Sequence, residues 1–497
     1  MFVNKRIGIE RWAFGYLAAC LLVVVGAALF REYPFVNHDV AFNLVTGRQI
    51  VSGVPFYVDW MDNNPPSIYL ISAMVSWLAG ANAHLEIMLY SALFLGCAGL
   101  GIQGCSRSLR QEGREDLRAV VLWAQLFVAL SASISISEFG QREALFFLLF
   151  LPHLVNRIWL EDAQESWRFR LLLLGFLAAM KPQFVLLLGW VEICGAVINR
   201  QVPWRAWLVF MAGGLLPIGI LFVLNPASAA EFFTVIVPFH FSDGAKVYDA
   251  SWSEVPHRIG WVSIALIVSG VLALFYAIWA RVFGEKERWL LGGVLVGSIL
   301  VVAQQGRLYA YHFILPAGMA ALVLALVMAR AWKNQAGAHR LLGGFALGIL
   351  VLNFLSLVRI EWLQSPPVET AMNEELDGHE RVLFVSTSVL HVYGYFYSGI
   401  VPVGPWAVHF VLPALQKEPD VAVRAWRLRE YGEFMRPHLE KAQPTAVVFS
   451  ANNQALAPFR SHTFPATYTL LADHLPLDGY SGRFVDLAGT WVIMEWE

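Results

Sequence analysis

Long apolar runs recur along this chain, and they constrain its fold more than any other feature. A helix needs about 20 apolar residues to cross a hydrocarbon core of roughly 30 Å, and most of these runs are long enough. Of the 497 residues, 57% are apolar and 14% are charged. Soluble domains have about 45–50% apolar and about 25% charged residues. We therefore predict a polytopic α-helical membrane protein.

The positions of the runs and of the basic residues predict the topology. We expect eleven spans, near residues 12–30, 85–104, 118–137, 143–160, 170–180, 184–198, 206–224, 258–280, 289–304, 313–330 and 341–358. If the further apolar stretch 67–79 lies in the interface, about 18 Lys and Arg residues fall on one side of the membrane and about 7 on the other. If 67–79 spans, that asymmetry is lost. We therefore expect the N-terminus inside, the C-terminus outside, and one external loop over 31–84 with helices lying on the membrane.

Within that loop, an amphipathic helix is expected to begin at Asp39. Val40, Leu44, Gly47 and Val51 fall at helical spacing and form its apolar face. Gly53 and Pro55 are expected to end it.

The chain becomes more polar after residue 360. Short β-type runs occur at 381–389, 445–451 and 490–496, and a charged helical stretch occupies 421–442. Residues 1–360 are therefore expected to form the membrane domain, and residues 361–497 a smaller external α/β domain.

Polar side chains gather where four connections reach the external face. Ionisable groups at membrane depth are costly, so they are functional candidates. The candidates are His38, Asp39, Asp59, Asp62, Glu138, Arg142, Glu143, Lys181, Gln305, Arg307, Tyr311 and His312.

This mixture of acids and cations suits transfer of a group from a phosphate. A carboxylate can act as a general base on a hydroxyl, and Arg or Lys can hold phosphate. A lipid-linked phosphate fits best, since its tail would lie in the bilayer and its head at this depth. Structural explanations exist too: Asp39 could be only a first-turn acid, Asp59 and Asp62 turn residues, and Lys181 an interfacial lysine.

The first loop resembles that of a known family. His38-Asp39 follows the first span, and then come the run Gly53-Val54-Pro55-Phe56-Tyr57-Val58-Asp59, then Asp62, and then Pro65-Pro66. This pattern is similar to the GT-C superfamily of polyprenyl-phosphate-sugar-dependent glycosyltransferases, in its protein O-mannosyltransferase and lipid A aminoarabinose transferase branches. The resemblance covers the first loop closely and the rest of the chain in outline.

The resemblance implies an inverting transfer of a sugar from a polyprenyl-phosphate donor to a lipid, glycan or protein acceptor. Asp39 takes the position of the catalytic base. The family often has two adjacent acids there, and often Lys before Pro-Pro, whereas this chain has His38-Asp39 and Asn64. Arg142, Lys181 and Arg307 are therefore the candidates to contact the donor phosphate.

The resemblance also implies a location and a set of partners. We expect a bacterial inner-membrane protein with a cytoplasmic N-terminus and a periplasmic terminal domain. We expect no cofactor and no nucleic-acid partner; a divalent metal held by Asp39, Asp59 and Asp62 is conceivable but not favoured. The alternatives are a transporter or flippase of a lipid-linked substrate, and a polymerase or ligase of the O-antigen type.

Overall fold

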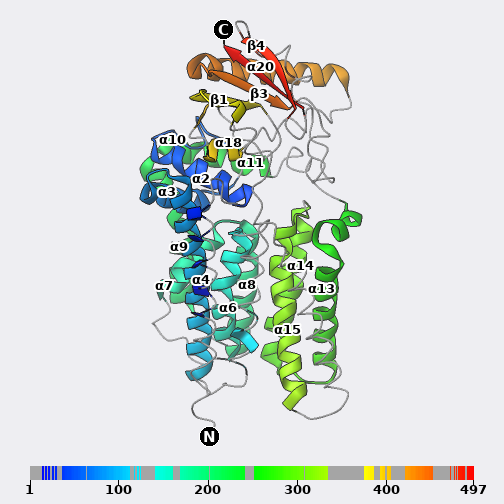
Figure 1. The fold of residues 1–497 in the computed structure, drawn as a ribbon. Helices are drawn as coiled ribbons and strands as arrows, with labels where there is room; N and C mark the ends of the chain where they lie inside the picture. Colours follow the sequence, from blue (N-terminus) through cyan, green and yellow to red (C-terminus); the bar gives the residue numbers. More distant parts are fainter. Residues whose placement is uncertain are drawn as a thin grey trace.

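The structure, a computed structural model, describes most of the chain as a helical bundle with a mixed sheet beyond one end (Figure 1). It describes residues 36–62, 64–111, 140–159, 168–200, 202–240, 251–306, 308–333, 374–385, 392–397, 400–404, 420–450, 480–486 and 490–496, with single residues or short stretches within 14–30, 117–124 and 471–477. We call the end of the bundle that faces the sheet the outer end.

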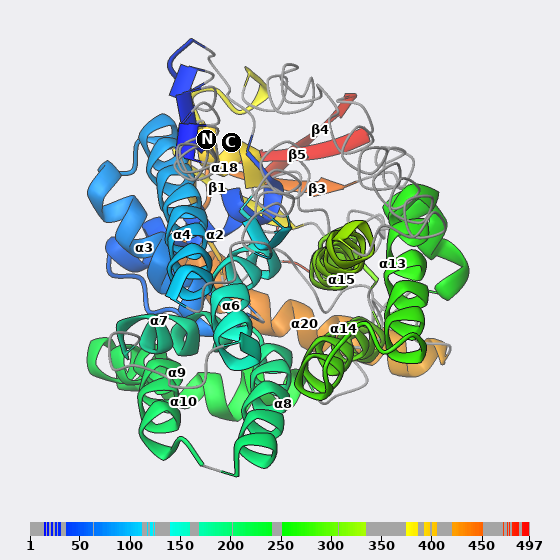
Figure 2. The ribbon, with the colours of Figure 1, turned by 90° about the horizontal axis from the view of Figure 1, so that it is seen from below.

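The bundle has two groups of helices (Figure 2). The first contains α4 (Ala83–Gln111), α6 (Arg142–Trp159), α7 (Arg168–Ala178), α8 (Pro182–Asn199) and α9 (Trp204–Leu224). The second contains α13 (Val255–Trp279), α14 (Glu285–Gln305) and α15 (Ile314–Lys333). Short helices lie between the two groups in sequence: α10 (Pro226–Glu231), η4 (Phe232–Ile236), α11 (Val237–His240) and η5 (Trp252–Glu254).

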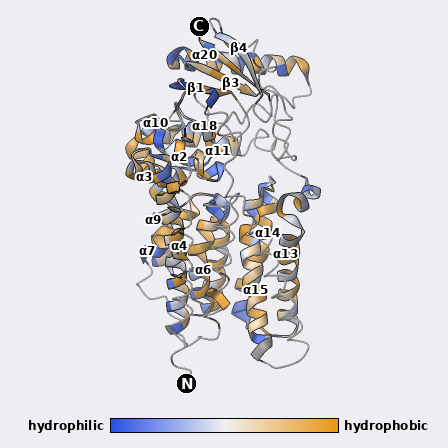
Figure 3. Cartoon of the chain, viewed as in Figure 1, coloured by the Kyte–Doolittle hydropathy of each residue, from blue (hydrophilic) through white to orange (hydrophobic). Residues whose placement is uncertain are grey.

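The chain is a polytopic membrane protein. Six helices in the described part are long and apolar enough to cross a membrane: Ala83–Arg110, Pro182–Asn199, Trp204–Leu224, Ile259–Trp279, Glu285–Gln305 and Ala310–Arg330. Along these helices, most residues are coloured as hydrophobic in Figure 3. The predicted spans 118–137 and 341–358 fall largely outside the described residues, and 12–30 falls partly outside them. The total of eleven spans therefore stays a prediction.

Two helices of the first loop lie beside each other at the outer end (Figure 1). Helix α2 (His38–Val51) occupies the predicted range, and Gly53, with φ of 86°, follows its end. Helix α3 (Pro66–Ala79) has 14 residues, so at 1.5 Å per residue it is about 21 Å long and too short to cross the core. A Cβ on Gly47 would lie 2.5 Å from the carbonyl carbon of Ser72, so only glycine allows this close approach of α2 to α3.

The terminal segment forms a five-stranded sheet in the order β2-β1-β3-β5-β4. Its strands are β1 (Arg381–Val385), β2 (Val401–Pro402), β3 (Ala446–Ser450), β4 (Tyr480–Asp486) and β5 (Thr490–Trp496). The β1–β2 and β1–β3 pairs are parallel, whereas β3–β5 and β4–β5 are antiparallel. Helix α18 (Val392–Tyr397) follows β1, and helix α20 (Val421–Ala442) precedes β3. The predicted strands and charged helix are confirmed, but the predicted boundary at residue 360 lies outside the described residues.

The two faces of the sheet belong to different hydrophobic clusters, because side chains alternate along a strand. Val382 and Phe384 of β1, with Val448 of β3, join the cluster that continues into the bundle. Leu383 and Phe449 point the other way and pack with Leu428, Tyr431, Met435 and Leu439 of α20. The sheet is therefore held between α20 and the outer end of the bundle.

Candidate active site

Asp39 lies in the first turn of α2, at the outer end. The Asn37 side chain caps this helix, accepting hydrogen bonds from the backbone N–H groups of Asp39 (2.8 Å) and Val40 (3.3 Å). Gln141 donates from Nε2 to Asn37 Oδ1 (3.1 Å) and to Asp39 Oδ2 (2.8 Å). The other carboxylate oxygen, Oδ1, lies 3.4 Å from His38 Nε2, and 30% of the Asp39 side chain is exposed. Asp39 is thus oriented on one side and accessible on the other.

The start of α6 supplies the next group, Arg142. It follows a turn at Gly140, where φ is 77° and where a Cβ would lie 2.6 Å from the Tyr90 ring. The Tyr90 hydroxyl donates to the Gly140 carbonyl (2.9 Å) and fixes this turn. Arg142 Nη1 then donates to Asn64 Oδ1. The consecutive residues Gln141 and Arg142 therefore contact Asp39 of α2 and Asn64 of the following loop, respectively.

The loop that carries Asn64 is tightly folded. Asn64 donates from Nδ2 to Asp62 Oδ2 (2.7 Å) and to the Tyr69 hydroxyl (3.1 Å). The Tyr57 hydroxyl donates to the Asn64 carbonyl, and burial together with nearby Asp62 raises the pKa of Tyr57, so it stays a neutral donor. Asp62 is fully buried, so its contacts orient Asn64 and through it Arg142.

Lys181 and Glu143 form an ion pair between the starts of α8 and α6. Lys181 Nζ donates to Glu143 Oε1 and to Gln305 Oε1 (3.3 Å), and it lies 5.1 Å from the centre of the Tyr311 ring. Glu143 is 1% exposed, and its second oxygen, Oε2, is buried with no hydrogen-bond partner among the residues that the structure describes. A buried carboxylate oxygen without a donor is costly, so this oxygen can accept a hydrogen bond from a bound molecule.

An aromatic group from η6 (Ala310–Phe313) closes the arrangement. Tyr311 packs edge-on against His312 with 4.6 Å between ring centres, and it stacks with Tyr309 at 5.5 Å. The Tyr311 hydroxyl lies within electrostatic range of Asp39, Glu143 and Arg142. The carboxylate of α2, the cation of α6 and the Lys181 pair thus belong to one site.

The candidates predicted from the sequence have different outcomes. Nine of them fall into three sets of contacts: His38 with Asp39; Asp62 with Arg142 through Asn64; and Glu143, Lys181, Gln305, Tyr311 and His312. Asp59 does not take part in these contacts in the described part of the chain. It forms an ion pair with Lys441 of α20 at 3.3 Å, and the Lys441 side chain is 73% exposed. Glu138 and Arg307 lie outside the described residues. In the described part of the chain, no three His, Cys, Asp or Glu side chains are grouped as metal ligands, and the expectation of no cofactor stays a prediction.

Sequence reasoning missed the roles of Asn37, Gln141 and Asn64, which hold the ionisable groups in place. The signal was a polar residue directly beside each candidate: Asn37 precedes His38-Asp39, and Gln141 precedes Arg142. Neutral amides carry no charge to mark them, so only the hydrogen bonds identify them.

The sequence places most of the polar candidates at the external face, but one ionisable residue, Glu192, lies deep in the bundle. Glu192 lies ten residues into α8, about 15 Å from its start. It accepts from Arg157 (2.8 and 2.6 Å) and from Trp207 Nε1 (2.8 Å), and it hydrogen-bonds His153 (2.7 Å). His153 thus has a hydrogen-bonded packing role between α6 and α8.

Comparisons with known proteins give a match in structure only. No family model matches the chain, and no curated protein matches it in sequence. ArnT from Cupriavidus metallidurans, solved bound to undecaprenyl phosphate, is 16% identical; the match covers 97% of each chain with a TM-score of 0.56. The archaeal oligosaccharyltransferase AglB from Archaeoglobus fulgidus, solved with an inhibitory peptide and a dolichol-phosphate, is 12% identical; that match covers 96% of this chain and 74% of AglB, with a TM-score of 0.48. The likeness to ArnT shows a shared fold over nearly the whole chain.

Proposed function

From the premise that this chain has the GT-C fold, we propose that it is a membrane glycosyltransferase. The proposed donor is a polyprenyl-phosphate-linked sugar, and the acceptor is a lipid, glycan or protein hydroxyl at the periplasmic face. ArnT, which shares the fold, was solved with undecaprenyl phosphate bound.

One observation carries the proposal. Gln141 donates to the Asp39 carboxylate, and the next residue, Arg142, extends to Asn64. A base and a cation are therefore positioned by consecutive residues at the outer end of the bundle, and both lie within electrostatic range of Tyr311. Transfer from a phosphate needs both, because the nucleophile must lose a proton while the leaving group gains negative charge.

The reaction follows from this arrangement. The acceptor oxygen attacks the anomeric carbon, and its proton passes to the Asp39 carboxylate. The bond between the anomeric carbon and the phosphate oxygen breaks, and its electron pair leaves with the polyprenyl phosphate. Attack from the face opposite the leaving group inverts the anomeric centre.

Arg142 is the cation best suited to the leaving phosphate. Only its Nη1 has a hydrogen bond among the described residues, to a neutral amide, so its other donors are available. Lys181 is already neutralised by Glu143 and covered by Tyr311, so it acts mainly by orienting Glu143. Glu143 Oε2 would then accept a hydrogen bond from a hydroxyl group of the donor sugar.

The location follows the same proposal. The chain would lie in a bacterial inner membrane with the outer end of the bundle at the periplasmic side. Residues 361–497 would form a periplasmic domain above the site.

Mass spectrometry of a deletion strain tests the function. We expect one monosaccharide to disappear from an envelope lipid, glycan or protein, and its polyprenyl-phosphate form to accumulate. The wild-type gene should reverse both changes, whereas the Asp39→Asn variant should reverse neither. Unchanged envelope sugars and lipids would contradict the proposal.

The purified protein separates the rival functions. With the accumulated lipid and acceptor, a transferase releases free polyprenyl phosphate. A flippase would move the donor without breaking its anomeric bond, and a polymerase or ligase would require a diphosphate-linked glycan. Either of those results would replace the proposed function.

A further inference from the structure

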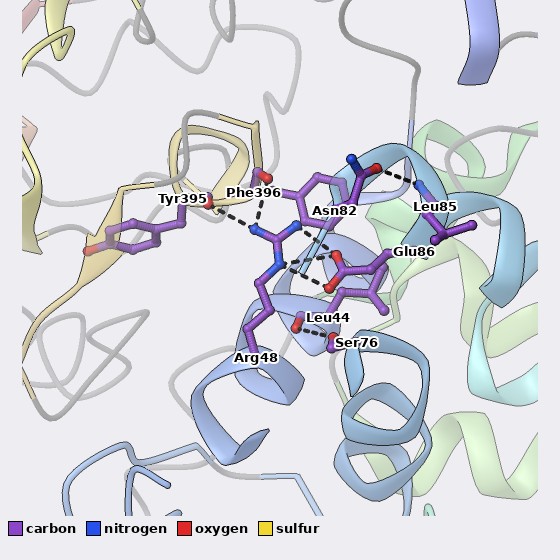
Figure 4. A network of polar contacts seen from close by, with 8 residues as sticks. All are labelled: Leu44, Arg48, Ser76, Asn82, Leu85, Glu86, Tyr395 and Phe396. Atoms are coloured by element: carbon purple, nitrogen blue, oxygen red, sulfur yellow. Dashed lines mark hydrogen bonds and ion pairs between the residues drawn. The ribbon is translucent and has the colours of Figure 1, made fainter. Parts of the chain in front are cut away.

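Helix α2 is anchored at both of its ends. Its first turn is held by Asn37 and Gln141, as described above. Its last turn is held by Arg48, whose side chain touches two other parts of the molecule (Figure 4). Arg48 lies nine positions after Asp39, about 13.5 Å along the helix.

Arg48 uses its whole guanidinium group. Nε and Nη2 donate to the Glu86 carboxylate at 3.0 and 2.7 Å, in the first turn of α4. Nη1 donates to the backbone carbonyls of Phe396 (3.0 Å) and Tyr395 (3.4 Å), and the guanidinium lies 4.7 Å from the centre of the Phe396 ring. One side chain thus joins the first loop, the bundle and the terminal segment (Figure 4).

Each contact answers a physical need. Glu86 is fully buried, and a buried carboxylate requires a paired charge. The carbonyls of Tyr395 and Phe396 belong to the last turn of α18, where carbonyls have no partner within the helix. A lysine could meet the first need but not both, because its donors lie on a single nitrogen and lack the spread of the guanidinium fork.

Helix α18 is in turn fixed to the sheet. The Tyr395 hydroxyl donates to the Val382 carbonyl and accepts from the Phe384 backbone N–H, both at 3.1 Å. A continuous set of contacts therefore runs from β1 through Tyr395 and Arg48 to the helix that carries Asp39.

We propose that Arg48 is a positioning residue that couples the terminal segment to the site by fixing the tilt of α2. This inference rests on the proposed function for its effect on catalysis. A rigid helix displaced at one end moves the group at the other, and a displacement of about 1 Å in a reacting group can cost about a hundredfold in rate.

The test is Arg48→Lys, which keeps a charge for Glu86 and loses the link to α18. We expect folding to be retained, kcat to fall about tenfold, and KM for the lipid donor to stay unchanged. Hydrogen exchange of the α2 amides should become faster. The matched control is Lys441→Ala, which removes the exposed ion pair with Asp59 between the first loop and α20; it should change neither measurement.

The outcomes are separable. Wild-type kcat and wild-type α2 exchange in Arg48→Lys would overturn the inference. If the wild-type protein itself transfers no sugar, the proposed function fails, and the exchange of α2 still decides whether Arg48 positions this helix.

Discussion

Helices α6 and α8 are joined by two carboxylates of opposite character, Glu143, which is buried, and Glu192, whose side chain is 13% exposed. Near the outer end, Glu143 of α6 pairs with Lys181, and one of its oxygens lacks a hydrogen-bond partner in the described part of the chain. Deeper in the bundle, Glu192 of α8 has two partners on each oxygen, from His153, Arg157 and Trp207. A carboxylate whose acceptor positions are all used by the protein cannot accept a hydrogen bond from a ligand. A carboxylate with an unused oxygen can. The difference separates a group that holds two helices together from a group that can bind a substrate.

The largest effect is expected at Asp39, at the outer end. Asp39→Asn removes the proposed base but keeps an oxygen that can accept from Gln141. We expect kcat to fall about a hundredfold to ten-thousandfold, as for loss of a general base, with an unchanged melting temperature. Steady-state assay of the purified variant checks this. Near wild-type turnover would remove Asp39 from the mechanism and leave the outer end without a base.

Glu192→Gln tests the deeper carboxylate. Removing one partner of a buried ion pair costs about 3–5 kcal/mol; the pair of Glu192 and Arg157 is partly buried, so we expect a loss of stability of about 3 kcal/mol, at the lower end of that range. Turnover per folded molecule should not change, because Glu192 belongs to a saturated group. Thermal denaturation and an activity assay measure the two effects. If Glu192→Gln lost turnover but kept its stability, a full set of hydrogen-bond partners would not distinguish a structural carboxylate from a substrate-binding one.

Arg142→Ala tests the cation with available donors. The loss of charge-assisted hydrogen bonds to phosphate should cost about 2 kcal/mol, which is about a 30-fold weaker affinity for the lipid donor. Arg142→Lys should recover part of the lost affinity, because lysine keeps the positive charge but not the paired donors of the guanidinium group. Binding of polyprenyl phosphate to the purified variants measures the change. Equal affinities in wild type and Arg142→Ala would exclude a phosphate contact.

The smallest effect is expected for Glu143→Gln, the same substitution as at Glu192. We expect kcat/KM to fall about tenfold, because a substrate hydroxyl loses a charged acceptor. Stability should fall less than in Glu192→Gln, because Lys181 keeps Gln305 and the Tyr311 ring. Parallel melting curves and assays of the two variants make the comparison direct. If Glu143→Gln lost more stability than Glu192→Gln, the assignment of Glu192 to holding the helices and of Glu143 to binding substrate would be wrong.

Much of the fold could be predicted because its signals are local. The apolar runs, the helix beginning beside Asp39 and the strands around Val382 and Val447 each follow from composition and period. The site was predictable as a set of charged residues near connections, but not as an arrangement. Asp59 and Asp62 look alike in sequence, yet one faces Lys441 on the surface and the other is buried against Asn64. That difference depends on the folding of the loop, and so do the contacts of Gln141 and Arg48 with residues far away in the chain.

The alternating strand residues also bear on how this molecule can be divided. Val382, Phe384 and Val448 belong to the hydrophobic cluster that continues into the bundle. The face of the sheet that is turned toward the bundle is therefore part of a hydrophobic core. A fragment cut between α15 and β1 would carry that face uncovered, and exposed apolar patches of this kind promote aggregation. The terminal segment is therefore not an interchangeable module. An evolutionary exchange or an engineered graft would need to bring a matching surface on the bundle with it.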